Sequence, residues 1–166
     1  ISNKKSNSWS FINSGYNLRP TDISASIGNS QLKKLKKISL IRQQNFKSIR
    51  SALLDDKRYS NKFDIIEENI DNKIVWFGIP IILKSTEKNH KQKVTNKLNK
   101  FGIDTRPLIS GNFANQPAVK LYKLKINSNL KNANFIDKNS FFIGLHNTRT
   151  SLKTVNYIKE AFYASL

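Results

Sequence analysis

Residues 15–32 have the sequence GYNLRPTDISASIGNSQL, which contains the start of the first strong helix of the chain. Pro20 fixes the backbone at the entry, Thr21 can cap the first turn, and Asp22 suits the positive end of the helix dipole. Apolar residues then recur at helical spacing and form one stripe, made of Leu35, Ile38, Phe46, Ile49 and Leu53. We predict one long helix over residues 22–55. At the usual rise it is about 50 Å long, which is more than a small domain needs, so it should reach toward another domain or subunit.

Residues 55–72 are polar and predict an irregular connection. Residues 74–83 are almost all apolar and predict a strand. Because Pro80 cannot donate a hydrogen bond, we expect this strand to be an edge or bulged strand. Residues 88–100 predict a helix that ends at Gly102, where a left-handed residue is expected. One face of this helix is apolar and carries Val94, Leu98 and Phe101.

The last part of the chain predicts two more strands. Residues 103–109 favour a short strand, residues 110–112 an exposed turn, and Gln116-Pro117 the start of a short helix, since proline suits a first helical turn. Residues 141–144 favour a third strand. A final helix from Ser151 should bury Leu152, Val155, Ile158 and Phe162. Together these elements predict an α+β fold, an α/β sandwich of three strands flanked by helices.

Length and composition limit the function. The chain has 166 residues, enough for one domain with a hydrophobic core. It contains no Cys, which excludes disulfides, thiolate zinc sites and cysteine nucleophiles. No apolar stretch reaches the roughly 20 residues of a membrane span, and no signal-peptide pattern opens the chain. We expect a cytoplasmic protein without a membrane partner.

The charge is strongly basic, with 29 Lys and Arg against 11 Asp and Glu, a net charge of +18. Such a charge suits a polyanionic partner, so a nucleic-acid-binding module without catalytic activity is an alternative. However, Lys far outnumbers Arg, and the dense runs at residues 33–37 and 84–100 have helical patterns typical of solvated faces. We therefore expect no nucleic-acid partner. A structural protein that caps another chain through its long helix is a third hypothesis.

Motifs for a self-contained active site are missing. The chain has no G-x-S-x-G, H-E-x-x-H, Walker or G-x-G-x-x-G pattern, and His90 and His146 lie far apart in the sequence. We expect no catalytic residue and no metal site within this segment.

Four stretches resemble a known family in its own order. Residues 15–32 are similar to the block G-Y-N-x-x-x-T-D-x-x-A-A-I-G-x-x-Q-L of the DegT/DnrJ/EryC1/StrS aminotransferases. The sequences WFGIP, GIDTRPL and FIGLH follow at residues 76–80, 102–108 and 142–146. Ser26 and Asn147 depart from the family pattern, which more often has alanine and proline there.

The resemblance implies the small C-terminal domain of a fold-type-I transferase that depends on pyridoxal phosphate, with a short, mainly antiparallel sheet. Residues 1–21 would lead from a missing large domain, residues 22–55 would form the connecting helix, and residues 56–166 the small domain. The chain begins at Ile1 and contains no Met, which favours a fragment. The large domain would hold the cofactor, as pyridoxal or pyridoxamine phosphate, and the small domain would close the site across a homodimer.

The resemblance also implies site residues. Asn17 would bind the cofactor phosphate of the partner subunit, although asparagine also caps turns. Arg19 and Arg106 would bind a nucleotide-sugar substrate, because a planar guanidinium suits a pyrophosphate, although either could form a surface ion pair. Three residues on turns or element ends would also contact the substrate or have no function: Asn112, Gln116 and His146.

Residues 110–117, with the sequence SGNFANQP, resemble the G-N-x-x-x-Q-P element of the family branch that contains sugar 3-dehydratases. This implies a nucleotide-linked 4-keto-6-deoxy sugar, acted on by transamination or 3-dehydration in deoxysugar or cell-surface polysaccharide synthesis, such as that of lipopolysaccharide. The residue that separates the two reactions, lysine or histidine, would lie upstream. Trp76 and Phe77 alternate within an apolar strand, so we expect both in the core and not stacked on substrate.

Overall fold

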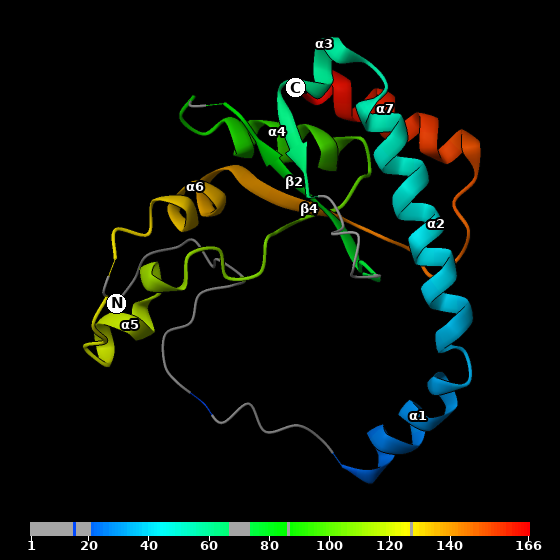
Figure 1. The fold of residues 1–166 in the computed structure, drawn as a ribbon, viewed down its shortest axis with the longest axis horizontal. Helices are drawn as coiled ribbons and strands as arrows, with labels where there is room; N and C mark the ends of the chain where they lie inside the picture. The colour runs from blue at the N-terminus through cyan, green and yellow to red at the C-terminus, as the bar shows by residue number, and fades with distance from the viewer. Residues whose placement is uncertain (1–14, 16–20, 67–73, 86, 127) are drawn as a thin grey trace.

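The computed structural model describes Gly15 and residues 21–66, 74–85, 87–126 and 128–166 (Figure 1). Its sheet has four antiparallel strands in the order β1-β2-β4-β3: β1 (Phe63–Ile65), β2 (Gly78–Leu83), β4 (Ser140–Gly144) and β3 (Thr105–Pro107). The helices are α1 (Asp22–Leu32), α2 (Leu35–Leu54), α3 (Lys57–Ser60), α4 (His90–Lys100), α5 (Pro117–Leu121), α6 (Lys131–Asn139) and α7 (Leu152–Ser165), and a 3-10 turn, η1, spans Phe113–Asn115. No helix among the described residues is both long and apolar enough to cross a membrane.

The predicted single helix is two helices, because α1 ends at Leu32 and α2 begins at Leu35. Gly28, Asn29 and Ser30 are weak helix formers just before the break. The lysines that follow lie at like-charge spacings of three and four residues, which destabilises a continuous helix, and they are Lys33, Lys34, Lys36 and Lys37. As a result, α1 lies apart from the sheet at the lower end of Figure 1, and none of its residues is buried.

Strand β2 is an inner strand whose register to both neighbours is unbroken, so the expectation of an edge or bulged strand was wrong. It pairs with β4 from Gly78 to Ile82 and with β1 from Ile81 to Leu83. Pro80 is tolerated because β1 ends at Ile65, whose partner is Ile81, so Pro80 lies just beyond the β1 ladder. Backbone groups of successive strand residues point alternately to the two neighbouring strands. Phe77 points toward β4, because its carbonyl oxygen accepts the N–H of Leu145 at 2.9 Å. Pro80, three residues later, therefore points toward β1, and the N–H that it lacks is on that side. Proline therefore limits β1 and leaves β4 pairing intact.

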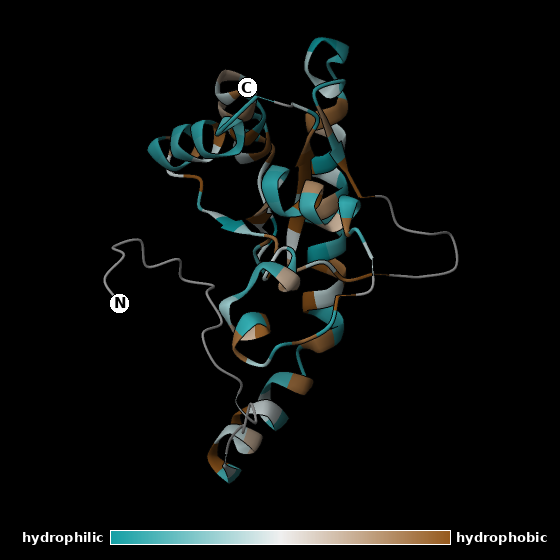
Figure 2. Ribbon diagram, turned by 90° about the vertical axis from the view of Figure 1, so that its left-hand side faces the viewer, coloured by the Kyte–Doolittle hydropathy of each residue, from teal (hydrophilic) through white to brown (hydrophobic). Residues whose placement is uncertain are grey.

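The core lies on one face of the sheet, under α2, α4 and α7. The odd-numbered residues of β2 and β4 point into it, as alternation along a strand requires, and they meet the apolar stripe of α2. Buried members of this cluster include Phe46, Ile49, Leu53, Ile79, Ile81, Val94, Leu98, Phe141, Ile143, Val155 and Phe162. Figure 2 shows hydrophobic colouring along the inner strands and mostly hydrophilic colouring on the helices around them.

Several local predictions are confirmed. Val94 and Leu98 of α4 are buried, and Gly102 adopts φ +72° at its end, where the Ile103 N–H donates to the Leu98 carbonyl at 3.0 Å. Helix α5 begins at Pro117, and Ser151 caps α7 by accepting the Thr154 N–H.

Other local predictions were wrong. Leu152 is 76% exposed because it stands in the first turn of α7, before the helix reaches the core. Phe77 is 51% exposed and lies outside the core. Trp76 is partly buried, packs against the core and stacks on Phe46. The segment expected to be irregular contains α3 and β1, and α6 was not anticipated. Both omitted elements are short or polar, so their sequence signal is weak.

Candidate functional site

Two of the six residues implied as site residues, Asn17 and Arg19, lie outside the described residues. The other four are Arg106, Asn112, Gln116 and His146. They stand on β3, on the connection between β3 and α5, and on the loop after β4.

Arg106 lies on the sheet face opposite the core. It pairs with Phe142, and residues paired across an antiparallel ladder point to the same face, which is also the face of Gly78 and Gly144. We call this face, defined by Gly78, Arg106, Phe142 and Gly144, the outer face. Arg106 is exposed, and no described carboxylate forms an ion pair with it. Within the described part of the chain, the guanidinium is therefore available to an anion.

Two glycines face each other on the outer face. Gly78 is paired with Gly144, and the ring of Phe142 lies so close to Gly78 that an added Cβ would come within 2.4 Å of its Cδ2 atom. An added Cβ at Gly144 would meet nothing within 4 Å. Phe77 extends this surface, because its ring contacts that of Phe142 edge to face at 5.1 Å. The outer face thus combines an open glycine, an exposed aromatic ring and an arginine that pairs with no described carboxylate.

The turn at residues 110–112 is not exposed as predicted, because Asn112 is 5% exposed. Its Oδ1 atom accepts the Ala114 N–H at 3.1 Å, and its Nδ2 group donates to Asn134 Oδ1 on α6 at 2.9 Å. Gly111 adopts φ +60° and lies against Asp137 of α6, where an added Cβ would come within 2.0 Å of Oδ1. Helix α6, which the sequence did not reveal, covers this turn.

Two further contacts hold the same turn. Gln116 donates its side-chain amide to the Ser110 carbonyl at 3.2 Å. Asn115 donates to Asn134 Oδ1 at 3.1 Å and to Asp137 Oδ2 at 3.3 Å. The Asn112 side chain therefore stabilises the turn through its own hydrogen bonds. Gln116, beside it, is only partly buried.

His146 is exposed in the loop that joins β4 to α7. It lies four residues beyond Phe142, the partner of Arg106, which is about 13 Å along an extended strand. His146 therefore lies beyond the end of β4, about 13 Å of extended chain from the residue that Arg106 faces.

Asn45 on α2 was missed by the sequence analysis. It is 2% exposed and bonds to the backbone of the His146 loop, which no local pattern would reveal. One signal was available, because Asn45 stands seven residues after Ile38 and four before Ile49, on the apolar stripe where a polar side chain needs a buried partner.

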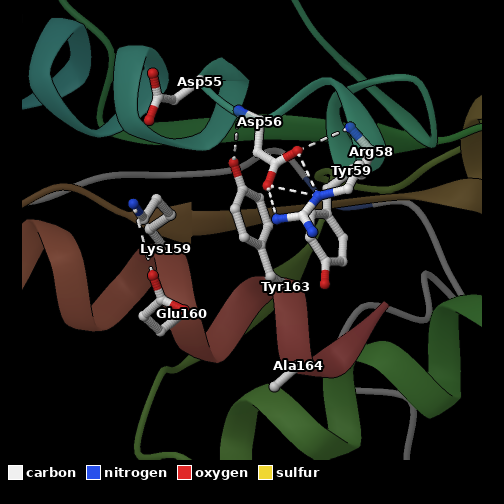
Figure 3. A pocket seen from close by; sticks show the side chains of 8 residues that line it. All are labelled: Asp55, Asp56, Arg58, Tyr59, Lys159, Glu160, Tyr163 and Ala164. Atoms are coloured by element: carbon white, nitrogen blue, oxygen red, sulfur yellow. Dashed lines mark hydrogen bonds and ion pairs between the residues drawn. The ribbon is translucent and has the colours of Figure 1, made fainter.

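A hollow between α3 and α7 contains none of the predicted site residues (Figure 3). It is lined by Asp55, Asp56, Arg58, Tyr59, Lys159, Glu160, Tyr163 and Ala164. The Tyr163 hydroxyl lies 3.0 Å from the Leu53 carbonyl oxygen and 3.2 Å from that of Ala52, at the end of α2, and Tyr163 stacks on Tyr59 at 4.2 Å. Arg58 pairs with Asp56 at 2.6 Å, and its hydrogen bonds lower the pKa of the Asp56 carboxyl. These groups satisfy one another and join α2, α3 and α7.

No cluster of three or more His, Cys, Asp or Glu side chains suited to a metal ion occurs in the part of the chain that the structure describes. The chemistry available on the outer face is the binding of an anion by Arg106. Gln116 and His146, whose side chains carry hydrogen-bonding groups, stand on the β3–α5 connection and on the loop after β4.

Comparison with known proteins identifies the family. A GDP-4-keto-6-deoxy-D-mannose 3-dehydratase of Escherichia coli O55:H7 is 31% identical over 154 residues, which are 92% of this chain and 38% of that protein. A lipopolysaccharide biosynthesis protein of Salmonella typhimurium is 27% identical over 154 residues, 93% of this chain and 34% of that protein. The solved structure of the E. coli 3-dehydratase with bound hydrated PLP is 30% identical, has a TM-score of 0.73 and covers 93% of this chain and 38% of its own.

The chain thus spans less than two fifths of the length of these relatives. The likeness to a solved 3-dehydratase at TM-score 0.73 confirms the predicted α+β fold class and its mainly antiparallel sheet. Residues 1–162 match the family model described as the DegT/DnrJ/EryC1/StrS aminotransferase family. The resemblance drawn from residues 15–32 and the three later stretches is confirmed, and the chain belongs to this family.

Proposed function

We propose that this chain forms the C-terminal part of a pyridoxal-phosphate-dependent enzyme that acts on a nucleotide-linked 4-keto-6-deoxy sugar. The E. coli relative named as a GDP-4-keto-6-deoxy-D-mannose 3-dehydratase supports this substrate class and favours 3-dehydration over transamination. The Salmonella relative named for lipopolysaccharide biosynthesis supports a role in cell-surface polysaccharide synthesis.

The observation that carries the proposal is Arg106, which has no ion pair with any carboxylate that the structure describes, on an outer face that is open at Gly144. A guanidinium forms paired hydrogen bonds to phosphate oxygens, so Arg106 suits the diphosphate of a nucleotide sugar. His146, in the loop that follows β4, would contact another part of the same ligand.

The β3–α5 connection would contribute near the opposite end of β4 from His146, because β3 runs antiparallel to β4, from Thr105 opposite Ile143 to Pro107 opposite Phe141. Gln116 would donate or accept a hydrogen bond to the ligand, because it is only partly buried. Asn112 would act by holding the turn through Ala114 and Asn134, since its own amide is almost fully enclosed.

Pyridoxal phosphate, when bound, would supply an electron sink for cleavage of a bond next to the sugar carbonyl. Arg106 suits a phosphate of the substrate better than the phosphate of the cofactor. Cofactor phosphates are commonly bound at the start of a helix, whereas Arg106 is exposed on strand β3. We keep Asn17 as the residue proposed to bind the cofactor phosphate and Arg19 as a second substrate residue.

We also propose that the complete gene product is a cytoplasmic homodimer. Helix α1 supports this, because it buries none of its own residues and exposes Ile23, Ile27 and Leu32 by 74%, 60% and 63%. Exposed apolar stripes of this kind mark surfaces that another protein part covers. In sedimentation experiments, Ile23→Asp with Ile27→Asp should halve the mass of the particle. An unchanged mass with lower stability would place α1 against its own chain instead.

The reaction can be tested directly with the complete gene product. It would be incubated with pyridoxal phosphate, glutamate and GDP-4-keto-6-deoxymannose, and the sugar products would be analysed by mass spectrometry. We expect a product that lacks the 3-hydroxyl. A product that gains an amino group would favour transamination, and recovery of unchanged sugar would contradict the proposed function.

A further inference from the structure

Asn45 is a buried polar residue within an apolar helix stripe. Its side chain is 2% exposed, and its neighbours Phe46 and Ile49 belong to the core. Burial of an amide is unfavourable unless its donors and its acceptor are satisfied. The partners of Asn45 therefore indicate what the residue does.

All three hydrogen bonds of the Asn45 side chain go to one loop, 101 to 105 residues away in the sequence. The Nδ2 group donates to the carbonyl oxygens of His146 at 3.2 Å and Thr148 at 2.8 Å. The Oδ1 atom accepts the Thr150 N–H at 2.9 Å. The loop between β4 and α7 is thus bound to α2 at both of its ends and in its middle.

The loop itself faces solvent, because the residues from His146 to Arg149 are exposed. The Asn45 amide reaches it from the core side and bonds only to its backbone, so it leaves the His146 imidazole free.

We propose that Asn45 is a positioning residue that holds residues 146–150, and with them the His146 imidazole, in place for the nucleotide-linked sugar. The role in ligand binding rests on the proposed function, whereas the anchoring of the loop does not. Asn45 does not touch the ligand, because its side chain is enclosed. Its effect on binding therefore passes through His146.

The test uses the complete gene product with two substitutions at this site. Asn45→Leu has a similar volume and forms no hydrogen bond. Asn45→Asp keeps the acceptor for the Thr150 N–H and loses both donors, and it serves as the second variant if Asn45→Leu does not fold. Tyr163→Phe is the control, because it removes hydrogen bonds at the other end of α2 without touching the loop.

The first measurement is hydrogen exchange of the amides of residues 146–150. We expect exchange at least tenfold faster in Asn45→Leu, a smaller increase in Asn45→Asp and no increase in Tyr163→Phe. Equal exchange in Asn45→Leu and wild type would overturn the inference whether or not the protein binds a sugar.

The second measurement is the affinity for GDP-mannose, a stable GDP-linked sugar, in a double-mutant cycle with His146→Ala. We expect each single substitution to weaken binding about tenfold and the double variant to bind no more weakly than His146→Ala alone. Additive losses would mean that Asn45 acts only through general stability, which overturns the inference. If loop exchange rises but His146→Ala binds normally, the role of His146 in the proposed function fails, and with it the link from Asn45 to binding.

Discussion

Gly78 and Gly144 lie directly opposite each other in β2 and β4, yet only Gly144 has room for a side chain. The Phe142 ring and the Ile143 carbonyl oxygen close the space at Gly78, at 2.4 Å and 3.0 Å from an added Cβ. Because both positions lie in the same antiparallel pair, the same substitution at each should change strand propensity similarly. A difference in stability between the two variants then reports the difference in packing.

We predict that Gly78→Ala destabilises the protein by about 1–3 kcal/mol, because the Phe142 ring must move. Gly144→Ala should change stability by less than about 1 kcal/mol in either direction. Urea unfolding of both variants measures the difference. Equal losses at the two positions would contradict the packing described for the outer face.

Gly111→Ala should be more damaging than Gly102→Ala. Both glycines have positive φ, +60° and +72°, so both substitutions incur the cost of a left-handed residue, about 1–2 kcal/mol. Only Gly111 faces a neighbour, the Asp137 carboxylate, which Asn115 holds in place. We expect the free energy of unfolding to fall by about 1 kcal/mol more in Gly111→Ala. A larger loss in Gly102→Ala would argue against the contact between the turn and α6.

Removal of the Tyr163 hydroxyl should loosen the joint between α2, α3 and α7. Tyr163→Phe keeps the stacking on Tyr59 and loses the hydrogen bonds to the α2 carbonyls. We expect a loss of about 1–2 kcal/mol in thermal or urea unfolding, because two carbonyl oxygens and the Asp56 N–H lose their partner. An unchanged midpoint would mean that water replaces the hydroxyl at no cost.

Asp56 should contribute to stability only above acidic pH. Hydrogen bonds from Arg58 lower the pKa of Asp56 in the folded chain below its unfolded value of about 4. A carboxyl with a depressed folded pKa stabilises the protein at pH above the unfolded pKa, and this contribution disappears as the pH falls through the folded pKa.

Asp56→Asn and Arg58→Gln should therefore lose less stability than wild type on acidification below about pH 5, as measured by unfolding at several pH values. Asp104→Asn, which removes the same charge at an exposed position before β3, is the control. Parallel pH curves for wild type and Asp56→Asn would show that the pair with Arg58 has no influence.

Sequence patterns predicted those parts of the fold that local chemistry determines. Gly102 and Ser151 mark helix ends through backbone freedom and a hydroxyl cap, and these signals lie within a few residues of each other. The apolar spacing from Ile38 to Leu53 likewise located α2, because burial of one stripe repeats every turn.

Features that depend on distant partners were not predictable in this way. Pro80 suggested an edge strand, and only the short β1, which ends at Ile65, explains how it lies inside the sheet. Asn112 was expected on an exposed turn, but α6 covers it from 22 residues away. The three bonds of Asn45 likewise join segments more than 100 residues apart.

The residues of the candidate site also differ in how far the sequence predicted them. Arg106 and His146 were identified through the family resemblance, and the register of β3 on β4 then places Arg106 opposite Phe142, while His146 lies in the loop after β4. Asn45, which supports the His146 loop, and Asn134, which supports the Asn112 turn, act through contacts that no short motif contains.

Titration of the complete gene product with GDP-mannose tests the central claim most directly, by comparing Arg106→Gln with Arg58→Gln. Both variants lose one guanidinium, but Arg106 lies on the outer face and Arg58 lines the hollow beside α7. We predict that Arg106→Gln weakens binding tenfold or more, or about 1.4 kcal/mol, while Arg58→Gln binds as wild type does. Equal affinities for Arg106→Gln and wild type would contradict the assignment of a nucleotide-sugar site to this face.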